Sequence, residues 1–123
     1  MRDIKFRGLR KDGAGWIYGF FYKIRDKSYI LNEKLSPEGF VMLDVIIEVI
    51  PESVGQLIGE TKEGDFLFEG DIIMNGESIR FIEFRWSNFV ATTPSKTETI
   101  LLSFIKNAKA IGNIHENSEL LNP

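Results

Sequence analysis

Apolar and polar residues alternate along most of the chain, and this period of two predicts β-strands. The pattern begins at residues 2–9, where Ile4 and Phe6 share the apolar side and Lys5 and Arg7 the polar side. Further strands are expected at residues 16–22, 27–31, 40–50, 54–59, 66–68, 71–74, 79–86, 89–93 and 110–114. We therefore predict a mainly β fold.

Turn residues separate these strands. Asp and Gly in residues 11–15 favour a tight reversal, and residues 32–39 are polar and predict a loop. Residues 97–106 fit either a helix or a strand, and their β-branched residues make us favour the strand. A last helical turn is expected after Asn117, which is a suitable N-cap.

The predicted strand at residues 16–22 is apolar on both faces, which favours an interior position, whereas residues 27–31 are expected at an edge. One face carries Trp16, Tyr18, Phe20 and Tyr22. We interpret these rings as core residues. The alternative is a platform on which bases stack beside the cations of Lys23, Arg25 and Lys27.

Between Ile79 and Trp86 the apolar face changes sides by one residue, which indicates a bulge or a strand that passes between two layers. Gly70 within a strand pattern also suggests a bulge or a close backbone approach. Many short strands of this kind favour a curved or barrel-like antiparallel sheet with at most short helices. We expect one domain, residues 1–123.

The chain has no Cys among its 123 residues, which excludes disulfides, thiolate zinc sites and cysteine nucleophiles. The N-terminal residues are charged, and no apolar run is long enough for a signal peptide or a membrane span. We expect a cytoplasmic protein without a cofactor. Ten Phe residues need burial against a sheet or a partner, so self-association is a further expectation.

The net charge of −3 is unevenly distributed. Residues 1–27 carry +5, residues 28–71 carry −8, and residues 72–123 are neutral. In one interpretation, the two biased segments lie together and cancel. In the other, a basic patch binds an acidic partner. The patch residues would be Lys5, Arg7, Arg10 and Lys11. A nucleic-acid-binding protein would normally carry a larger basic excess.

Few residues suggest catalysis. Glu69 and Asp71 would lie on the same side of an extended chain, where they suit acid–base work or a hard cation, but fixing the turn at Gly70 is the simpler role. His115 is the only histidine, and we interpret it as a surface or capping residue. No serine lies in a nucleophile-elbow motif, and no phosphate-binding glycine motif occurs. We expect neither an enzyme nor a metal site.

Three segments, in order along the chain, resemble the YopX family of phage and prophage proteins. They are the start at Arg2–Arg7, the pair Gln56-Leu57-Ile58-Gly59 and Glu69-Gly70-Asp71-Ile72-Ile73, and the ending at Ile111–Leu121. The resemblance implies a phage-encoded protein of mainly β fold in the host cytoplasm, and it implies no catalytic residue. We interpret the signature as structural. Its residues are Gln56, Gly59, Glu69, Gly70, Asp71, Ile72, Gly112, Asn113, Glu116 and Asn117.

Three functions remain open from the sequence. We favour a non-catalytic accessory protein that binds a protein partner, in the host or in a copy of itself. The alternative is a small β protein that binds nucleic acid through its basic N-terminal hairpin. The least favoured is a hydrolase that uses Glu69 and Asp71 with a divalent metal ion.

Overall fold

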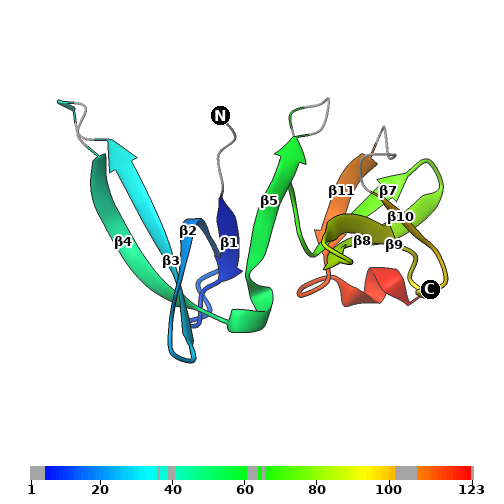
Figure 1. The fold of residues 1–123 in the computed structure, drawn as a ribbon, viewed down its shortest axis with the longest axis horizontal. Helices are drawn as coiled ribbons and strands as arrows, with labels where there is room; N and C mark the ends of the chain where they lie inside the picture. The colour runs from blue at the N-terminus through cyan, green and yellow to red at the C-terminus, as the bar shows by residue number, and fades with distance from the viewer. Residues whose placement is uncertain are drawn as a thin grey trace. The chain divides into compact units, whose positions relative to one another are not determined.

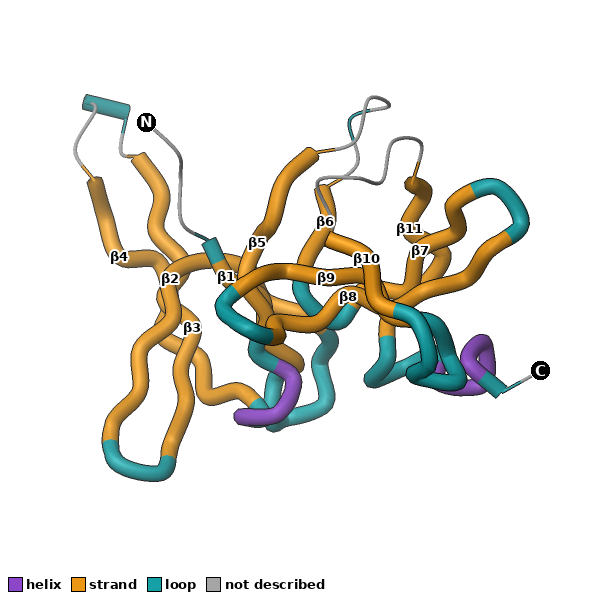
Figure 2. The backbone as a smooth tube through the Cα atoms, turned by 45° about the vertical axis from the view of Figure 1, so that its right-hand side comes forward, coloured by secondary structure: helices purple, strands orange, loops and turns teal. Residues whose placement is uncertain are grey.

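The computed structural model describes residues 5–35, 37–38, 41–60, 64, 66–101 and 108–122, with side chains except at 33–35, 41–45 and 101. The strands are β1 (Phe6–Leu9), β2 (Trp16–Ile24), β3 (Lys27–Leu35), β4 (Val41–Val49), β5 (Gly55–Glu60), β6 (Phe66–Phe68), β7 (Asp71–Asn75), β8 (Ser78–Arg85), β9 (Asn88–Thr92), β10 (Thr99–Leu101) and β11 (Ala108–Asn113). Two 3₁₀ turns are η1 (Pro51–Ser53) and η3 (Ser118–Leu121). Figures 1 and 2 show these elements.

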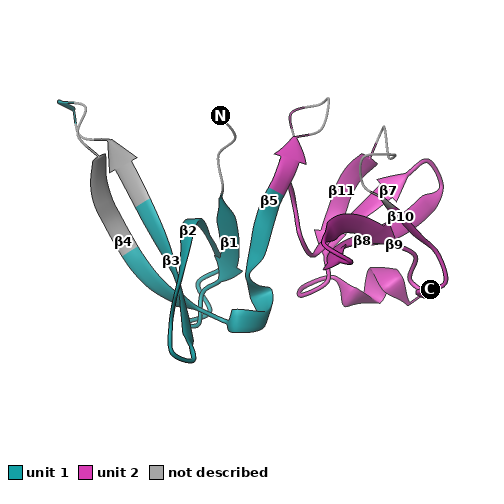
Figure 3. Ribbon diagram, viewed as in Figure 1, with its two compact units in different colours: residues 1–57 teal, residues 58–123 magenta. Residues whose placement is uncertain are grey.

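The chain divides into two compact units, residues 1–57 and 58–123 (Figure 3). One sheet has the strand order β4-β3-β2-β1-β5-β6 and the other β10-β9-β8-β7-β11, and the described strand pairs are antiparallel. The predicted mainly β fold with curved antiparallel sheets is confirmed, and neither strand order closes into a barrel. One domain over the whole chain stays a prediction.

The first sheet bends sharply at Gly19 in β2. The N-terminal half of β2 pairs with β1, ending at the pair Phe6–Gly19, and the C-terminal half pairs with β3, starting at Phe20–Leu31. A Cβ atom on Gly19 would lie 2.1 Å from the carbonyl oxygen of Leu31. The backbone of β3 therefore passes where any side chain at this position would be.

The bend brings the end of β4 back to the end of β1. The amide of Ile50 donates to the carbonyl of Leu9 at 2.9 Å, and the amide of Lys11 donates to the carbonyl of Glu48 at 3.1 Å. The inner face of this curl holds the core of the first unit. Its buried residues are Ile17, Ile30 and Val49, with Phe6, Phe21, Ile47 and Val54 packed against them. Full burial of one such aliphatic side chain stabilises the fold by roughly 1.5–3 kcal/mol.

The second unit has its own core, formed by Leu67, Ile73, Ile82 and Ala91. Strands β7, β8 and β9 contribute Ile73, Ile82 and Ala91, which share one face of the five-stranded sheet. Ile72 and Val90 are buried on the opposite face. The pairing of β11 with β7 shifts register between Ala110 and Gly112, which places a bulge just before the C-terminal turn.

The strand predictions hold with four corrections. β3 is interior rather than at an edge, because β4 pairs along it, and it reaches Leu35, so residues 32–39 are not all loop. β8 keeps one register with both neighbours, and the bulges lie in β3–β4 and β11 instead. Gly70 lies in the turn between β6 and β7 rather than in a strand bulge, and its backbone hydrogen bonds with Ile82 and Ile114 are the close approach given as the alternative. Residues 99–101 form the favoured strand, whereas residues 102–107 lie outside the described residues.

We predict that Gly19→Ala destabilises the protein by at least 2 kcal/mol, roughly the cost of a strained overpacked site, because the added Cβ meets rigid backbone. Gly59→Ala, in β5, is the matched control, since nothing lies within 4 Å of a Cβ there. We expect that control to change stability by less than about 0.5 kcal/mol. Urea unfolding followed by circular dichroism measures both. Equal stability of the two variants would contradict the role given to the bend.

Candidate functional site

Arg7 does not belong to an exposed basic patch. Its side chain is only 7% exposed, and its guanidinium lies over the Trp16 ring at 4.5 Å from the ring centroid. Arg7 lies on the side of β1 opposite Phe6, as the alternation predicts, but the indole of Trp16 in β2 covers this side, so Arg7 is not exposed. A guanidinium can be buried in this way because its planar surface stacks on an aromatic ring.

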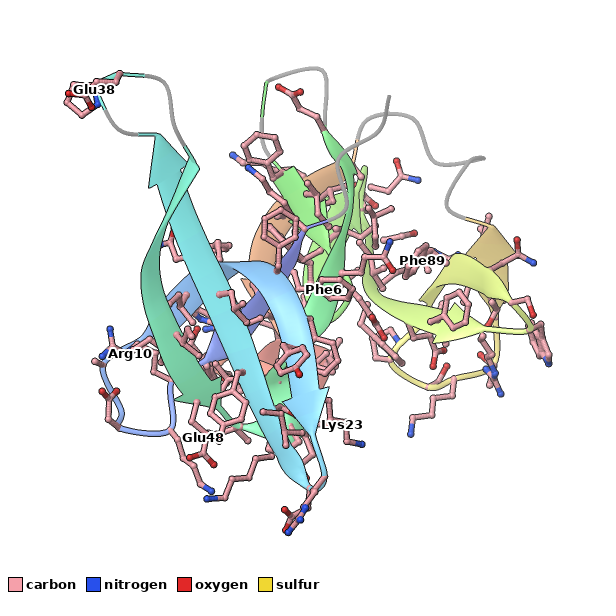
Figure 4. The ribbon with its side chains drawn as sticks, turned by 60° about the vertical axis from the view of Figure 1, so that its left-hand side comes forward. Phe6, Arg10, Lys23, Glu38, Glu48 and Phe89 are labelled. Carbon is pink, nitrogen blue, oxygen red and sulfur yellow. The ribbon has the colours of Figure 1, made fainter. Side chains whose placement is uncertain are left out.

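Arg10 and Lys11, which lie next to the first turn, each form an ion pair with a carboxylate. Arg10 makes two contacts with Asp12, Nε to Oδ1 at 3.1 Å and NH2 to Oδ2 at 2.8 Å. Lys11 Nζ lies 3.0 Å from Glu48 Oε2, which joins the basic N-terminal segment to the acidic one (Figure 4). Of the four predicted patch residues, Lys5 is exposed and has no ion pair with another described residue.

The signature acid Glu69 lies in the turn between β6 and β7, and Asp71 is the first residue of β7. Asp71 is buried, and its Oδ2 accepts a hydrogen bond from the backbone N–H of Phe68 at 2.8 Å. Gly70 has a φ of +93°, a conformation that side chains rarely adopt. Its N–H donates to the carbonyl of Ile82, and its carbonyl accepts from the N–H of Ile114. These hydrogen bonds fix the backbone of the turn.

The C-terminal signature forms a second hydrogen-bonded turn around Asn113. Asn113 Oδ1 accepts from the backbone N–H groups of His115 and Glu116, and its Nδ2 donates to Glu116 Oε1 at 3.1 Å. Asn117 Oδ1 accepts from the N–H of Asn113 at 3.1 Å. Asn117 is the N-cap of η3 as predicted, but its side chain makes no cap bond to that turn and binds Asn113 instead.

The two signature segments lie side by side although 40 positions separate them along the chain. Asp71 pairs with Asn113 across β7 and β11, and Ile72 pairs with Gly112. A Cβ on Gly112 would lie 2.7 Å from Asn117 Oδ1, so this glycine leaves room for the asparagine side chain. Of the earlier signature residues, Gln56 pairs with Phe6, and Gly59 lies in β5 with open space around it.

The aromatic residues of β2 form the largest exposed apolar row in the described part of the first unit. Tyr18, Phe20, Tyr22 and Ile24, which we call the β2 stripe, are 46 to 54% exposed. Only Trp16, at the start of this face, is half-buried. The prediction that these rings are core residues is wrong: β2 is interior within its sheet, but the core lies on the opposite face.

Neighbouring strands extend the β2 stripe sideways. Phe20 pairs with Leu31 of β3, which pairs with Ile46 of β4, and Ile46 is also 54% exposed. The hairpin that ends the stripe is basic. Lys23, which is labelled in Figure 4, is exposed, and so are Arg25 and Lys27, with Asp26 as the acid among them. None of the three cations makes an ion pair with another described residue.

A second exposed aromatic group lies at the tip of the β8–β9 hairpin. Trp86 is 70% exposed, and the guanidinium of Arg85 lies 4.6 Å from the centroid of its ring. Trp86 and Ser87 both have positive φ angles, 53° and 61°, at positions where such a turn favours Asn and Gly. Its exposed large apolar side chains are Trp86 and Phe84, fewer than in the row on β2.

The profile of the family described as "YopX protein" matches residues 5–122. The chain belongs to the YopX family. The match covers both compact units, so this YopX protein carries the family's sequence over almost its full length. No curated protein matches it.

The described residues of this YopX protein form neither a metal site nor a membrane-spanning helix. Within the described residues, no three His, Asp or Glu side chains come together as a metal site would require. No helix among the described elements has the length and apolar character needed to cross a membrane.

Sequence reasoning found the β2 stripe as a pattern but assigned it to the core. The exposure of the β2 stripe could have been suspected from the opposite face of the same strand, where Ile17 and Phe21 supply apolar side chains for the interior. When both faces of a strand in a small sheet are apolar, the core needs only one of them. The pairing of the two signatures had no comparable signal, because β7 and β11 are distant in the sequence.

We predict that Arg10→Gln raises the pKa of Asp12 towards its ordinary value. The hydrogen bond from Arg10 holds the pKa of the Asp12 carboxyl below its usual range, and the N–H of Ala14 lowers it further. Because the folded-state pKa is lowered, the stabilising effect of the pair is present at neutral pH and is lost as the pH falls through that pKa. An NMR titration of the carboxyl carbon measures the shift. Lys11→Gln is the control and should leave this titration unchanged.

We predict that Asn113→Ala destabilises the protein by about 2–3 kcal/mol, since it leaves two backbone N–H groups in a half-buried turn without their acceptor. Asn122→Ala removes the same group at an exposed position where the side chain makes no hydrogen bond with the described residues, and it should have little effect. Chemical denaturation measures both variants. A loss of partner binding by Asn113→Ala without a loss of stability would contradict a structural role.

Proposed function

We propose that this protein is a non-catalytic binding module that docks a protein partner on the β2 stripe. The observation that carries the proposal is the exposure of Tyr18, Phe20, Tyr22 and Ile24 on one continuous strand face. Each side chain left in water forgoes roughly 25 cal/mol for every Å² of apolar surface. Contiguous apolar patches of several hundred Å² on soluble proteins mark interaction sites.

Charge supports a protein partner over nucleic acid. The predicted N-terminal patch is largely used internally, by Arg7 on Trp16, Arg10 on Asp12 and Lys11 on Glu48. The whole chain is acidic, with a net charge of −3. A surface that binds by neutralising phosphates needs more unpaired cations than this. Tyrosine and phenylalanine are also suited to protein interfaces, where they bury large areas with few rotatable bonds.

Membership of the YopX family supports a proposal for where the protein acts. The resemblance to phage and prophage proteins supports an accessory role in the cytoplasm of a bacterial host. The turns at Asp71 and Asn113 support a non-catalytic role, because the signature residues are engaged in backbone hydrogen bonds.

One observation favours nucleic acid as the second candidate. Lys23, Arg25 and Lys27 flank the β2 stripe without ion pairs to other described residues, and rings beside cations can stack single-stranded bases. Such binding would weaken steeply as salt rises, whereas docking of an apolar protein surface would depend little on salt.

Capture from host lysate tests the proposal. We predict that Phe20→Ser/Tyr22→Ser reduces recovery of the partner at least tenfold, because both anchors leave the stripe. Phe84→Ser/Trp86→Ser is the matched control, since it removes two exposed aromatic residues from the other unit, and it should keep the partner. Quantitative mass spectrometry measures recovery.

A separate arm measures fluorescence anisotropy of a labelled oligothymidine at low and high salt. The second candidate would replace protein binding if two results are found together. The oligonucleotide must bind in a salt-sensitive way that requires Phe20 and Tyr22, and the double variant must still capture every host protein that the wild type captures. Equal recovery by both double variants would remove the β2 stripe from the function altogether.

A further inference from the structure

We propose that the partner of the β2 stripe is the β2 stripe of a second copy of this chain, packed face to face about a two-fold axis. This inference rests on the proposed function, since it names the occupant of the same surface. The five exposed apolar side chains concerned are Tyr18, Phe20, Tyr22, Ile24 and Ile46.

The available area fits a small symmetric interface. With roughly 200 Å² for each fully exposed large side chain, the five half-exposed ones offer about 500 Å² per chain. Two copies that cover each other would bury about 1,000 Å² in total, which is near the lower limit for a specific protein interface. A weak dimer is expected, with a dissociation constant on the order of micromolar.

The order of side chains along β2 selects an antiparallel arrangement. Residues 20 to 24, beyond the bend at Gly19, span about 13 Å of extended strand. With the axis at Phe21, Phe20 of one copy faces Tyr22 of the other. A two-fold interface uses the same surface on both chains. The row of large apolar side chains on one copy would therefore contact the same row on the other copy, running in the opposite direction.

The basic hairpin explains why the two strands would not run parallel. Lys23, Arg25 and Lys27 lie at one end of the stripe with only Asp26 among them, so a parallel pair would bring two positive clusters together. In the antiparallel pair the clusters lie about 20 Å apart, beyond the screening length of roughly 8 Å at physiological salt. Each cluster then lies near the Tyr18 end of the other copy, where aromatic rings attract cations.

Analytical ultracentrifugation of the full chain, from low micromolar to sub-millimolar concentration, tests the inference. The wild-type protein should shift with concentration from the chain mass of 14.1 kDa towards twice that mass. Phe20→Lys and Tyr22→Glu should each remain monomeric, since each places a charge in the apolar contact. Trp86→Lys, which alters a more exposed aromatic residue in the other unit, should dimerise like the wild type.

Mixing the two charged variants gives the sharpest test. Because Phe20 faces Tyr22 in the proposed pair, an equimolar mixture of Phe20→Lys and Tyr22→Glu should regain the dimer at low salt and lose it at high salt. Circular dichroism of each variant confirms that it is folded. A variant that fails to fold is replaced by Tyr22→Ser, which is expected to weaken the dimer at least tenfold.

Two results would overturn the inference: a wild-type protein that stays monomeric throughout, or a dimer that survives in both charged variants. A monomeric wild type whose captured host protein is still lost with Phe20→Ser/Tyr22→Ser would refute the second copy as occupant and leave the proposed function intact. If neither association depends on these residues, both proposals fail together.

Discussion

The passage of β3 over Gly19 is the contact on which the first unit depends. Where the backbone of one strand lies 2.1 Å from the position of a neighbour's Cβ, only a residue without that atom fits. Because Gly19 fits there, β2 can bend, so that its first half pairs with β1 and its second half with β3. The end of β4 then lies against the end of β1. One face of β2 becomes the interior around Ile17 and Ile30, and the other face is left outside with its aromatic side chains.

The second unit depends on a different feature, the hydrogen bonds that backbone N–H groups donate to side-chain oxygens at its turns. Asp71 and Asn113 are neighbours across two strands, and each accepts hydrogen bonds from the backbone of the turn beside it. Such turns place polar side chains in buried or half-buried positions, where a lost partner costs more than an exposed contact would. These signature residues of the second unit therefore hold its turns in place.

The exposed ion pairs of the N-terminal hairpin contribute little to folding, but they engage two of the four cations of the predicted basic patch. Arg10 and Lys11 are each within 3.0 Å of a carboxylate oxygen, and the two pairs are exposed or partly exposed, so each contributes little to folding. Only the Lys11–Glu48 pair brings a carboxylate from outside the segment that carries +5 in the sequence. The cations of the β2–β3 hairpin make no ion pair with another described residue, and they lie next to the apolar row, where a partner would meet both at once.

Most of the strands could be predicted without the structure, because side-chain alternation and turn residues act over a few neighbouring positions. The sequence by itself placed β2, β7, β9 and the turn after Asn117, and it identified Phe20 and its neighbours as a row on one face. It could not decide which face of β2 is interior, since both are apolar and only the bend at Gly19 selects one. It also could not show that Arg7 stacks on Trp16, or that Asp71 meets Asn113. These contacts join residues far apart in the chain, and their positions follow from how strands pair and sheets curve, which only the tertiary structure fixes.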